Sequence, residues 1–255
     1  MDIIQAIILA IIEGVTEFLP ISSTGHMILA SSLMKIESIA FVTTFEIFIQ
    51  LGAILAIVLI YSKRLLQGVA IYRKLVVAFL PTAIIGFLLY NFIKTYLFNP
   101  TIVAVSLIIG GIILILIDKK VINQKSKTAI LENISYKNAF IIGLTQCFSM
   151  IPGVSRAAAT IVGGVLNGLD KKQATEFSFL LAIPTMFAAS TYDLLKTPLE
   201  ISNKEIFFLS LGLFISFGTA WIAVNIFLKI VEKYGFEYFG YYRIIIGLLF
   251  LLILK

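Results

Sequence analysis

The residues best suited to chemistry lie close together near the start of the chain, in the stretch EGVTEFLPISSTGH at positions 13–26. Glu13 and Glu17 are four residues apart, so a helix places both carboxylates on one face, within reach of one cation. A hard divalent cation, Mg²⁺ or Ca²⁺, prefers oxygen ligands and can bridge to a phosphate, so the pair predicts a metal site. Two alternatives stay open: the pair pins helices together, or it belongs to the proton relay of a transporter.

The second half of the same stretch predicts a helix start. After Pro20, the residues ISSTGH can begin a new helix with Ser22, Ser23 or Thr24 at its N-cap. Free N–H groups and the positive end of the helix dipole favour an anion at such a point, above all a phosphate.

A second stretch, PGVSRAAAT at 152–160, offers the same arrangement after its Pro-Gly break. Its polar residues are Ser155, Arg156 and Thr160. Arginine presents a planar fork of donors to phosphate oxygens, so both stretches together predict one phosphate pocket. The alternative for Arg156 is a structural ion pair with a glutamate.

Three further polar side chains have two interpretations each. His26, the only histidine, can orient or deprotonate a serine or protonate a leaving group, or it is a hydrogen-bonded core residue. Glu46 either supports the site residues from behind or takes part in a contact between helices. Arg243, at the start of the last apolar run, is a positive-inside anchor or a further phosphate contact.

The composition places these residues in a membrane. Hydrophobic residues make up 60% of the 255 residues and charged residues only 13%, about half the share of a soluble domain. The net charge of +6 comes from basic residues in short loops between apolar runs, so no nucleic-acid partner is expected. Cys147 is the single cysteine and is expected to be a packed thiol.

Apolar runs long enough to cross a bilayer predict an all-α polytopic protein with six transmembrane helices. The expected spans are 39–61, 75–93, 101–117, 174–195, 206–228 and 241–254. Two other apolar stretches, 3–34 and 138–168, are interrupted by Pro, Gly and hydroxyl residues, which predicts half-helices that meet at a break. We interpret both as re-entrant hairpins in a single membrane domain, 1–255.

This arrangement gathers most Lys and Arg residues on one side, in loops 62–74, 118–137, 171–172 and 229–243. The positive-inside rule makes that side cytoplasmic and leaves both termini outside.

The two halves of the chain then have opposite orientation. EGVTEF at 13–18 parallels IGLTQC at 142–147; further on, His26 falls opposite Arg156, and Glu46 opposite Glu176. We predict inverted repeats, about 1–117 and 138–255, joined by a cytoplasmic linker, 118–137. Such folds place their site near the midplane, where broken helices meet.

The two motifs resemble those of the undecaprenyl-diphosphate phosphatases of the BacA type. EGVTEFLPISSTGH is similar to the first family motif almost in full, and PGVSRAAAT resembles the second, PGxSRSxxT. The resemblance extends over the whole chain, including the closing YYR at 241–243. One position departs, because the family's serine after the arginine is Ala157 here, and any phosphate contact from that hydroxyl is missing.

The resemblance implies an enzyme of the bacterial cytoplasmic membrane that removes the terminal phosphate of undecaprenyl diphosphate and recycles the lipid carrier for peptidoglycan synthesis. It implies that Glu13 and Glu17 bind the metal and the diphosphate, and that Ser23 and His26 sit at the reaction centre. It further implies that Ser155, Arg156 and Thr160 hold phosphate.

Phosphoanhydride hydrolysis needs charge neutralisation and an aligned nucleophile, here either Ser23 or a water activated by His26. The fold of type 2 phosphatidic acid phosphatases is excluded, since its mechanism uses two histidines. A polyprenyl-phosphate transporter or flippase is the main alternative, because inverted repeats with broken helices are common in transporters. The site is expected to open outward with the lipid tail left in the bilayer, and a homodimer is considered for the assembly.

Overall fold

A computed structural model of the chain describes residues 1–66, 70–97, 99–120, 131–196 and 202–253, and this described part is helical without any strand. Its longer helices in chain order are α1 Ile3–Thr16, α2 Ser23–Leu33, α3 Ala40–Ile60, α5 Ala70–Phe92, α6 Pro100–Lys120, α7 Tyr136–Cys147, α8 Arg156–Leu166, α9 Lys171–Lys196, α10 Asn203–Tyr234 and α11 Glu237–Ile253. Short elements between them are α4 Ser62–Leu66, a π-helical turn Ile93–Leu97 and the 3₁₀ turns Leu131–Asn133 and Phe148–Met150.

The predicted class, an all-α membrane protein, is confirmed. Within the described residues, five helices are long and apolar enough to cross a membrane: α3, α5, α6, α9 and α10. The sixth expected span corresponds to α11, which has 17 described residues, so the count of six stays a prediction. Residue 254 of that span and residues 121–130 of the predicted linker lie outside the described part.

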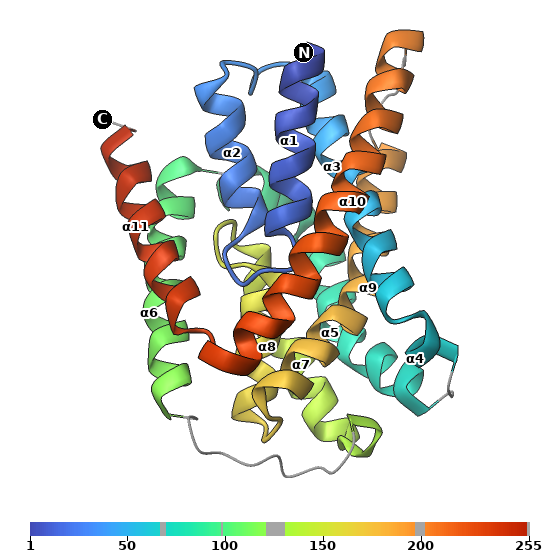
Figure 1. The fold of residues 1–255 in the computed structure, drawn as a ribbon, viewed down its shortest axis with the longest axis vertical. Coiled ribbons are helices and arrows are strands. Elements are labelled where there is room, and N and C mark those ends of the chain that lie inside the picture. The colour runs from blue at the N-terminus through green and yellow to red at the C-terminus, as the bar shows by residue number, and fades with distance from the viewer. Residues whose placement is uncertain (67–69, 98, 121–130, 197–201, 254–255) are drawn as a thin grey trace.

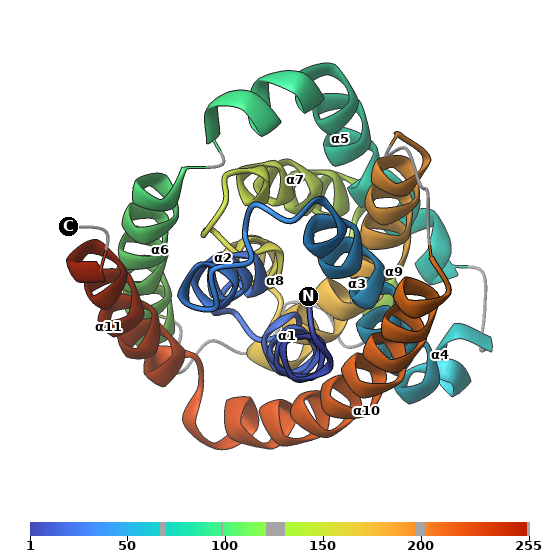
Figure 2. The same cartoon turned by 90° about the horizontal axis from the view of Figure 1, so that it is seen from above.

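The two interrupted stretches fold as helical hairpins, α1 with α2 (hairpin 1) and α7 with α8 (hairpin 2). The longest arm, α1, has 14 residues and measures about 21 Å, which is too short for a hydrocarbon core of about 30 Å. Hairpin 1 lies at the end of the molecule that carries both termini and hairpin 2 at the opposite end, with their turns at mid-height (Figure 1). Seen from above, the hairpins occupy the centre and α5, α6, α10 and α11 the periphery (Figure 2).

Each hairpin break ends in a capping serine in a strained conformation. Ser22 has φ 73° and its Oγ accepts the N–H of Gly25 at 3.3 Å, so the predicted N-cap is confirmed. Ser155 has φ 74° and caps the N–H of Ala158 at 3.2 Å. A positive φ is uncommon for a non-glycine residue and often marks a functional site. The caps set Ser23 opposite Arg156, which corrects the predicted pairing of His26 with Arg156.

The first arms of the hairpins make matching close contacts. A Cβ at Gly14 would lie 2.5 Å from the carbonyl oxygen of Ser216, so α1 packs directly on the backbone of α10. A Cβ at Gly143 would lie 2.1 Å from the carbonyl oxygen of Ala78, where α7 meets α5. Small residues permit this backbone approach in membrane proteins, where packing replaces the hydrophobic effect. The matching contacts support the inverted repeat, which stays a prediction.

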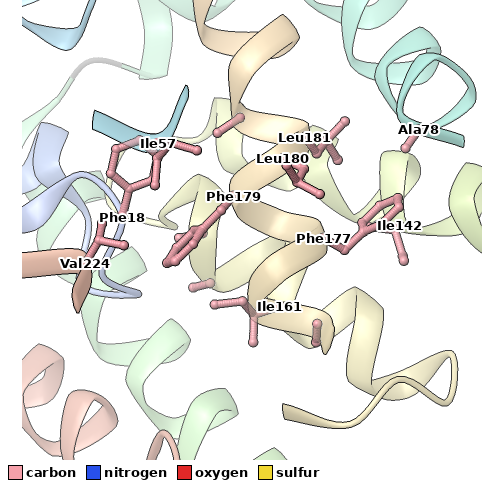
Figure 3. Close-up of a cluster of buried hydrophobic side chains, with 14 of the residues drawn as sticks. Phe18, Ile57, Ala78, Ile142, Ile161, Phe177, Phe179, Leu180, Leu181 and Val224 are labelled. Atoms are coloured by element: carbon pink, nitrogen blue, oxygen red, sulfur yellow. The ribbon is translucent and has the colours of Figure 1, made fainter. Parts of the chain in front are cut away.

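The main apolar core surrounds α9 and fixes the height of the hairpin turns. Phe177, Phe179, Leu180 and Leu181 project from α9 in several directions (Figure 3). Phe18, in the turn of hairpin 1, packs edge to face on Phe179 with ring centroids 5.5 Å apart, a favourable aromatic geometry. This contact anchors the turn that carries the polar residues.

Candidate active site

A cavity of about 470 Å³ lies where the two hairpin turns face α5 and α9. Its polar end is formed by residues of both breaks, namely Glu17, Ser22, Ser23, Thr24, Ser155 and Arg156. Its apolar walls come from α5 and α9 and include Phe79, Phe87, Met186 and Ala189. The two sequence motifs therefore lie at one cavity, as predicted. Four of the predicted site residues line it: Glu17, Ser23, Ser155 and Arg156.

Glu17 stands at the centre of the polar end. Its Oε2 accepts a short hydrogen bond from the hydroxyl of Ser23. Its Oε1 forms an ion pair with Nη2 of Arg156 at 3.3 Å. Both partners are at least nine-tenths buried, and a charge-assisted contact is strengthened when water is excluded. The carboxylate thus connects a candidate nucleophile with a candidate phosphate donor.

Besides its ion pair with Glu17, Arg156 has two further contacts that hold it in place. Its Nη1 donates to the carbonyl oxygen of Ser178 at 3.0 Å, and its guanidinium lies 5.3 Å from the ring centroid of Phe18. Its Nε is buried and has no hydrogen-bond partner. A buried, unsatisfied donor on a cationic side chain is costly, so this end of the cavity favours an anion that would complete its hydrogen bonds.

Thr160 lies behind Arg156, outside the set of residues that line the cavity. It is fully buried, and its hydroxyl bonds the Oγ of Ser178 at 2.6 Å and the carbonyl oxygen of Arg156 at 2.9 Å. In this geometry Thr160 supports the arginine and has no route to a phosphate. The predicted direct phosphate contact is not seen.

Glu13 is 1% exposed and lies one turn before Glu17, behind the cavity wall. Its Oε1 is buried without a hydrogen-bond partner. Its electrostatic neighbours are Glu17, Glu46 and Arg156, so three carboxyl groups share one arginine. Such an excess of buried carboxylates requires protons or a cation.

The described residues contain no group of three or more His, Cys, Asp or Glu side chains placed to hold a metal ion. The fit of a divalent cation therefore depends on the Glu13 and Glu17 pair. Mg²⁺ is commonly held by one or two carboxylates together with substrate phosphates. Glu17 lines the cavity where such phosphates would lie, and the unpartnered oxygen of Glu13 would add a ligand from behind Glu17.

His26 does not line the cavity. Its Nδ1 lies 2.8 Å from the carbonyl oxygen of Ser22 and its Nε2 lies 2.8 Å from the hydroxyl of Tyr242 on α11. The structure brings Ser23 to Glu17, whereas His26 points away toward α11. The predicted contact between the histidine and the reacting serine is not seen.

Arg243 is fully buried and its five N–H groups all meet backbone carbonyls. The acceptors are the oxygens of Pro20, Ser106, Leu107, Gly153 and Val154, at 2.8 to 3.3 Å. Neither predicted role is seen, because Arg243 lies inside the protein instead of in a basic loop and keeps no donor for a phosphate. It joins the turns of both hairpins to α6.

Several polar residues of the cavity are not among those predicted from the sequence. Gln50 lines it from α3 and accepts the hydroxyl of Ser190 at 3.2 Å. Tyr90 on α5 donates a short hydrogen bond to Asp193 on α9, and both line the same cavity. Polar side chains inside apolar runs were the available signal, since such residues usually face a cavity or a partner helix.

The family described as bacitracin resistance protein BacA matches residues 6–249. This chain belongs to that family. A protein of Campylobacter fetus subsp. fetus named undecaprenyl-diphosphatase is 50% identical over 256 residues, 99% of each chain. A protein of the same name from Bdellovibrio bacteriovorus is 50% identical, over 100% of this chain and 97% of its own. Another, from Aquifex aeolicus, is 49% identical over 96% of each chain.

Membership of the BacA family draws attention to Ala157, the position that departs from the motif. Ala157 is fully buried within the main apolar core and does not line the cavity. A hydroxyl at this position would face packed side chains, so its absence removes no contact from the cavity. We expected Ala157 to remove a phosphate contact, and its position in the apolar core corrects that expectation.

Proposed function

We propose that this chain hydrolyses undecaprenyl diphosphate to undecaprenyl phosphate and phosphate, returning the lipid carrier to peptidoglycan synthesis. Family membership and the printed names of relatives at about 50% identity support the reaction. The observation that carries the site is the contact of Glu17 with both the Ser23 hydroxyl and the Arg156 guanidinium at one cavity.

In the proposed reaction the Ser23 hydroxyl attacks the terminal phosphorus. Its proton passes to Glu17 Oε2, the oxygen that already accepts its hydrogen bond. An Oγ–P bond forms while the bond from phosphorus to the bridging oxygen breaks, and undecaprenyl phosphate leaves with that oxygen. Water then cleaves the phosphoserine and releases phosphate.

Electrostatic stabilisation comes from both hairpins. Arg156 turns its planar fork toward the terminal phosphate, and the N-termini of α2 and α8 add backbone dipoles at the same end of the cavity. Ser155 and Thr160 act by capping α8 and by holding Arg156 through Ser178. Phosphoryl transfer depends chiefly on such positioning and charge stabilisation.

A divalent cation, Mg²⁺ or Ca²⁺, is part of the proposal. Glu13 and Glu17 would hold it together with diphosphate oxygens, and it would offset the charge of the diphosphate. The buried, unpartnered oxygen of Glu13 supports this assignment.

We place the enzyme in the bacterial inner membrane with its site open to the outer side. The cavity is lined by the later turns of α5 and α9, which run toward the end with both termini (Figure 1). Pairs of basic residues lie on α4, at the end of α6 and at the start of α9, which are at the opposite end. The apolar cavity walls suit a prenyl chain that stays in the bilayer. Nucleic acid has no part in this function, and the homodimer stays a prediction.

The test is phosphate release from undecaprenyl diphosphate by purified protein in detergent, with Mg²⁺, Ca²⁺ or a chelator. We expect cation-dependent release by the parent chain and a loss of at least about 100-fold in Glu17→Gln, which removes the proton acceptor and the partner of Arg156. Glu37→Gln, a change at an exposed glutamate, serves as the matched control and should keep full activity.

Absence of release from folded protein would contradict the proposal, as would full turnover by Glu17→Gln. Lipid movement across vesicles without phosphate release would instead support the polyprenyl-phosphate transporter. Full phosphate release in the presence of chelator would contradict the cation requirement and leave the phosphatase reaction standing.

A further inference from the structure

His26 has a defined partner at each ring nitrogen, and the two partners differ in kind. The carbonyl oxygen of Ser22, 2.8 Å from Nδ1, can only accept a hydrogen bond. The hydroxyl of Tyr242, 2.8 Å from Nε2, can donate or accept. Nδ1 must therefore carry a proton, and Nε2 of the neutral ring accepts from Tyr242.

The placement of Tyr242 makes this contact specific. The rings of His26 and Tyr242 are parallel, with an interplanar angle of 1° and centroids 5.6 Å apart. Tyr242 also lines a groove of about 700 Å³ between α1, α10 and α11, which shares no lining residue with the cavity. The histidine thus links the capping residue of α2 with a helix that does not touch the cavity.

We propose that Tyr242 is a positioning residue that anchors the imidazole of His26 against the Ser22 carbonyl, in the Nδ1–H tautomer that this carbonyl selects, and thereby fixes the start of α2. In this tautomer the imidazole braces the carbonyl of Ser22, the residue before Ser23. The lone pair of Nε2 is directed to Tyr242 and away from the serine. The role in catalysis rests on the proposed function, whereas the tautomer does not.

The consequence concerns the orientation of the serine. The Ser22 side chain caps α2 and its carbonyl is braced by His26, so the backbone on the N-terminal side of Ser23 is held at two points. Loss of the Tyr242 hydroxyl removes one of the two anchors of the ring, so the imidazole can turn away from Ser22 and populate the Nε2–H tautomer, which cannot brace the carbonyl. Small displacements of a nucleophile lower turnover more than substrate affinity.

The chain offers a direct measurement, because His26 is its only histidine. Protein labelled with ¹⁵N-histidine gives signals from this ring alone. In the parent chain at neutral pH we expect a pyrrole-type Nδ1 and a pyridine-type Nε2. In Tyr242→Phe we expect the pattern to reverse or to become a mixture, and kcat to fall severalfold with KM within about twofold. Tyr241→Phe, a change at an exposed neighbour that donates to Glu237, is the control and should leave the spectrum and kcat as in the parent.

An Nε2–H signal in the parent chain would overturn the proposal without any variant. An unchanged spectrum in folded Tyr242→Phe would overturn it as well. If the tautomer is Nδ1–H and responds to Tyr242→Phe but no phosphate is released, the tautomer stands and the proposed function fails. If release occurs with the tautomer reversed, the function stands and this inference fails.

Discussion

At the scale of single residues, the site depends on how the two oxygens of one carboxylate are shared. Glu17 accepts from Ser23 with one oxygen and pairs with Arg156 through the other. Binding of a diphosphate offers Arg156 a new anionic partner and leaves Glu17 free to take the serine proton. This exchange of partners makes the serine a better candidate nucleophile than a water near His26, whose nitrogens are both engaged.

Replacement of Ser23 by Ala tests this choice. If Ser23 forms the phosphoenzyme, we expect kcat to fall by at least about 10³-fold, as for loss of a covalent nucleophile. Acid quenching of the parent chain with substrate labelled in the terminal phosphate should recover label on the protein.

Ser32→Ala, at an exposed serine of the same helix, is the matched control and should show parental turnover. If water is the nucleophile, Ser23→Ala loses only its hydrogen bond to the Glu17 carboxylate, worth about 1.5–3 kcal/mol, and keeps roughly a hundredth to a tenth of its rate. That result, with no labelled protein, would contradict the phosphoserine.

Sequence motifs predict correctly those features that depend only on residues nearby in the chain. Ser22 caps its own helix, and the spacing of Glu13 and Glu17 follows from one helix turn. The contacts predicted for Thr160 and His26 are not seen. A sequence motif can predict which face of a helix is polar, but not which other helix packs against that face. Thr160 meets Ser178 of α9, and His26 meets Tyr242 of α11.

At the scale of elements, Arg243 explains how two separate hairpins form one site. It donates to Pro20 in the turn of hairpin 1 and to Gly153 and Val154 in the turn of hairpin 2. Two further bonds reach α6, on which α11 packs. A single buried cation thus satisfies carbonyls that the broken helices leave without partners, which is required at membrane depth.

The sequence indicated the breaks and their polarity but not this connection. Pro20 and Gly153 are local signals for the ends of half-helices. The pairing of each break with an arginine 90 or more residues further on is a tertiary contact. The helix that carries Arg243 begins at Glu237, four residues before the expected span, so the arginine lies deeper in the helix than predicted.

Arg243→Lys should therefore destabilise the fold. An ammonium group cannot reach all five carbonyls, and the buried oxygens left without partners cost about 3 kcal/mol or more. For a chain of this size that lowers the unfolding midpoint by roughly 6–12 °C. The reaction of the single, half-buried Cys147 with a thiol-specific dye during heating in detergent reports the transition.

Arg73→Lys, at an exposed arginine, is the control and should unfold with the parent. A phosphate-binding role for Arg243 predicts the opposite outcome. In that case the midpoint is unchanged and KM for the lipid rises.

At the scale of the whole molecule, the two ends differ in charge and in access to the cavity. Both termini lie at one end (Figure 1). The cavity follows α5 and α9 toward that end, as far as Ile93 and Asp193. The other end carries Lys171, which pairs with the buried Asp118 at 2.6 Å. Excess basic residues mark the cytoplasmic end of a membrane protein, so the fold predicts an outward-facing site.

Cysteine labelling in intact cells tests this orientation, starting from a Cys147→Ala background that removes the single native thiol. Ser38→Cys lies in the exposed turn between α2 and α3 at the end with the termini, and Lys172→Cys lies at the exposed start of α9 at the other end. We expect an impermeant maleimide to label Ser38→Cys in intact cells and Lys172→Cys only after permeabilisation. The opposite pattern would place the cavity on the cytoplasmic side and would require the diphosphate to be hydrolysed there. Labelling of both positions in permeabilised cells shows that each thiol is reactive, so a missing signal in intact cells then reports the side of the membrane alone.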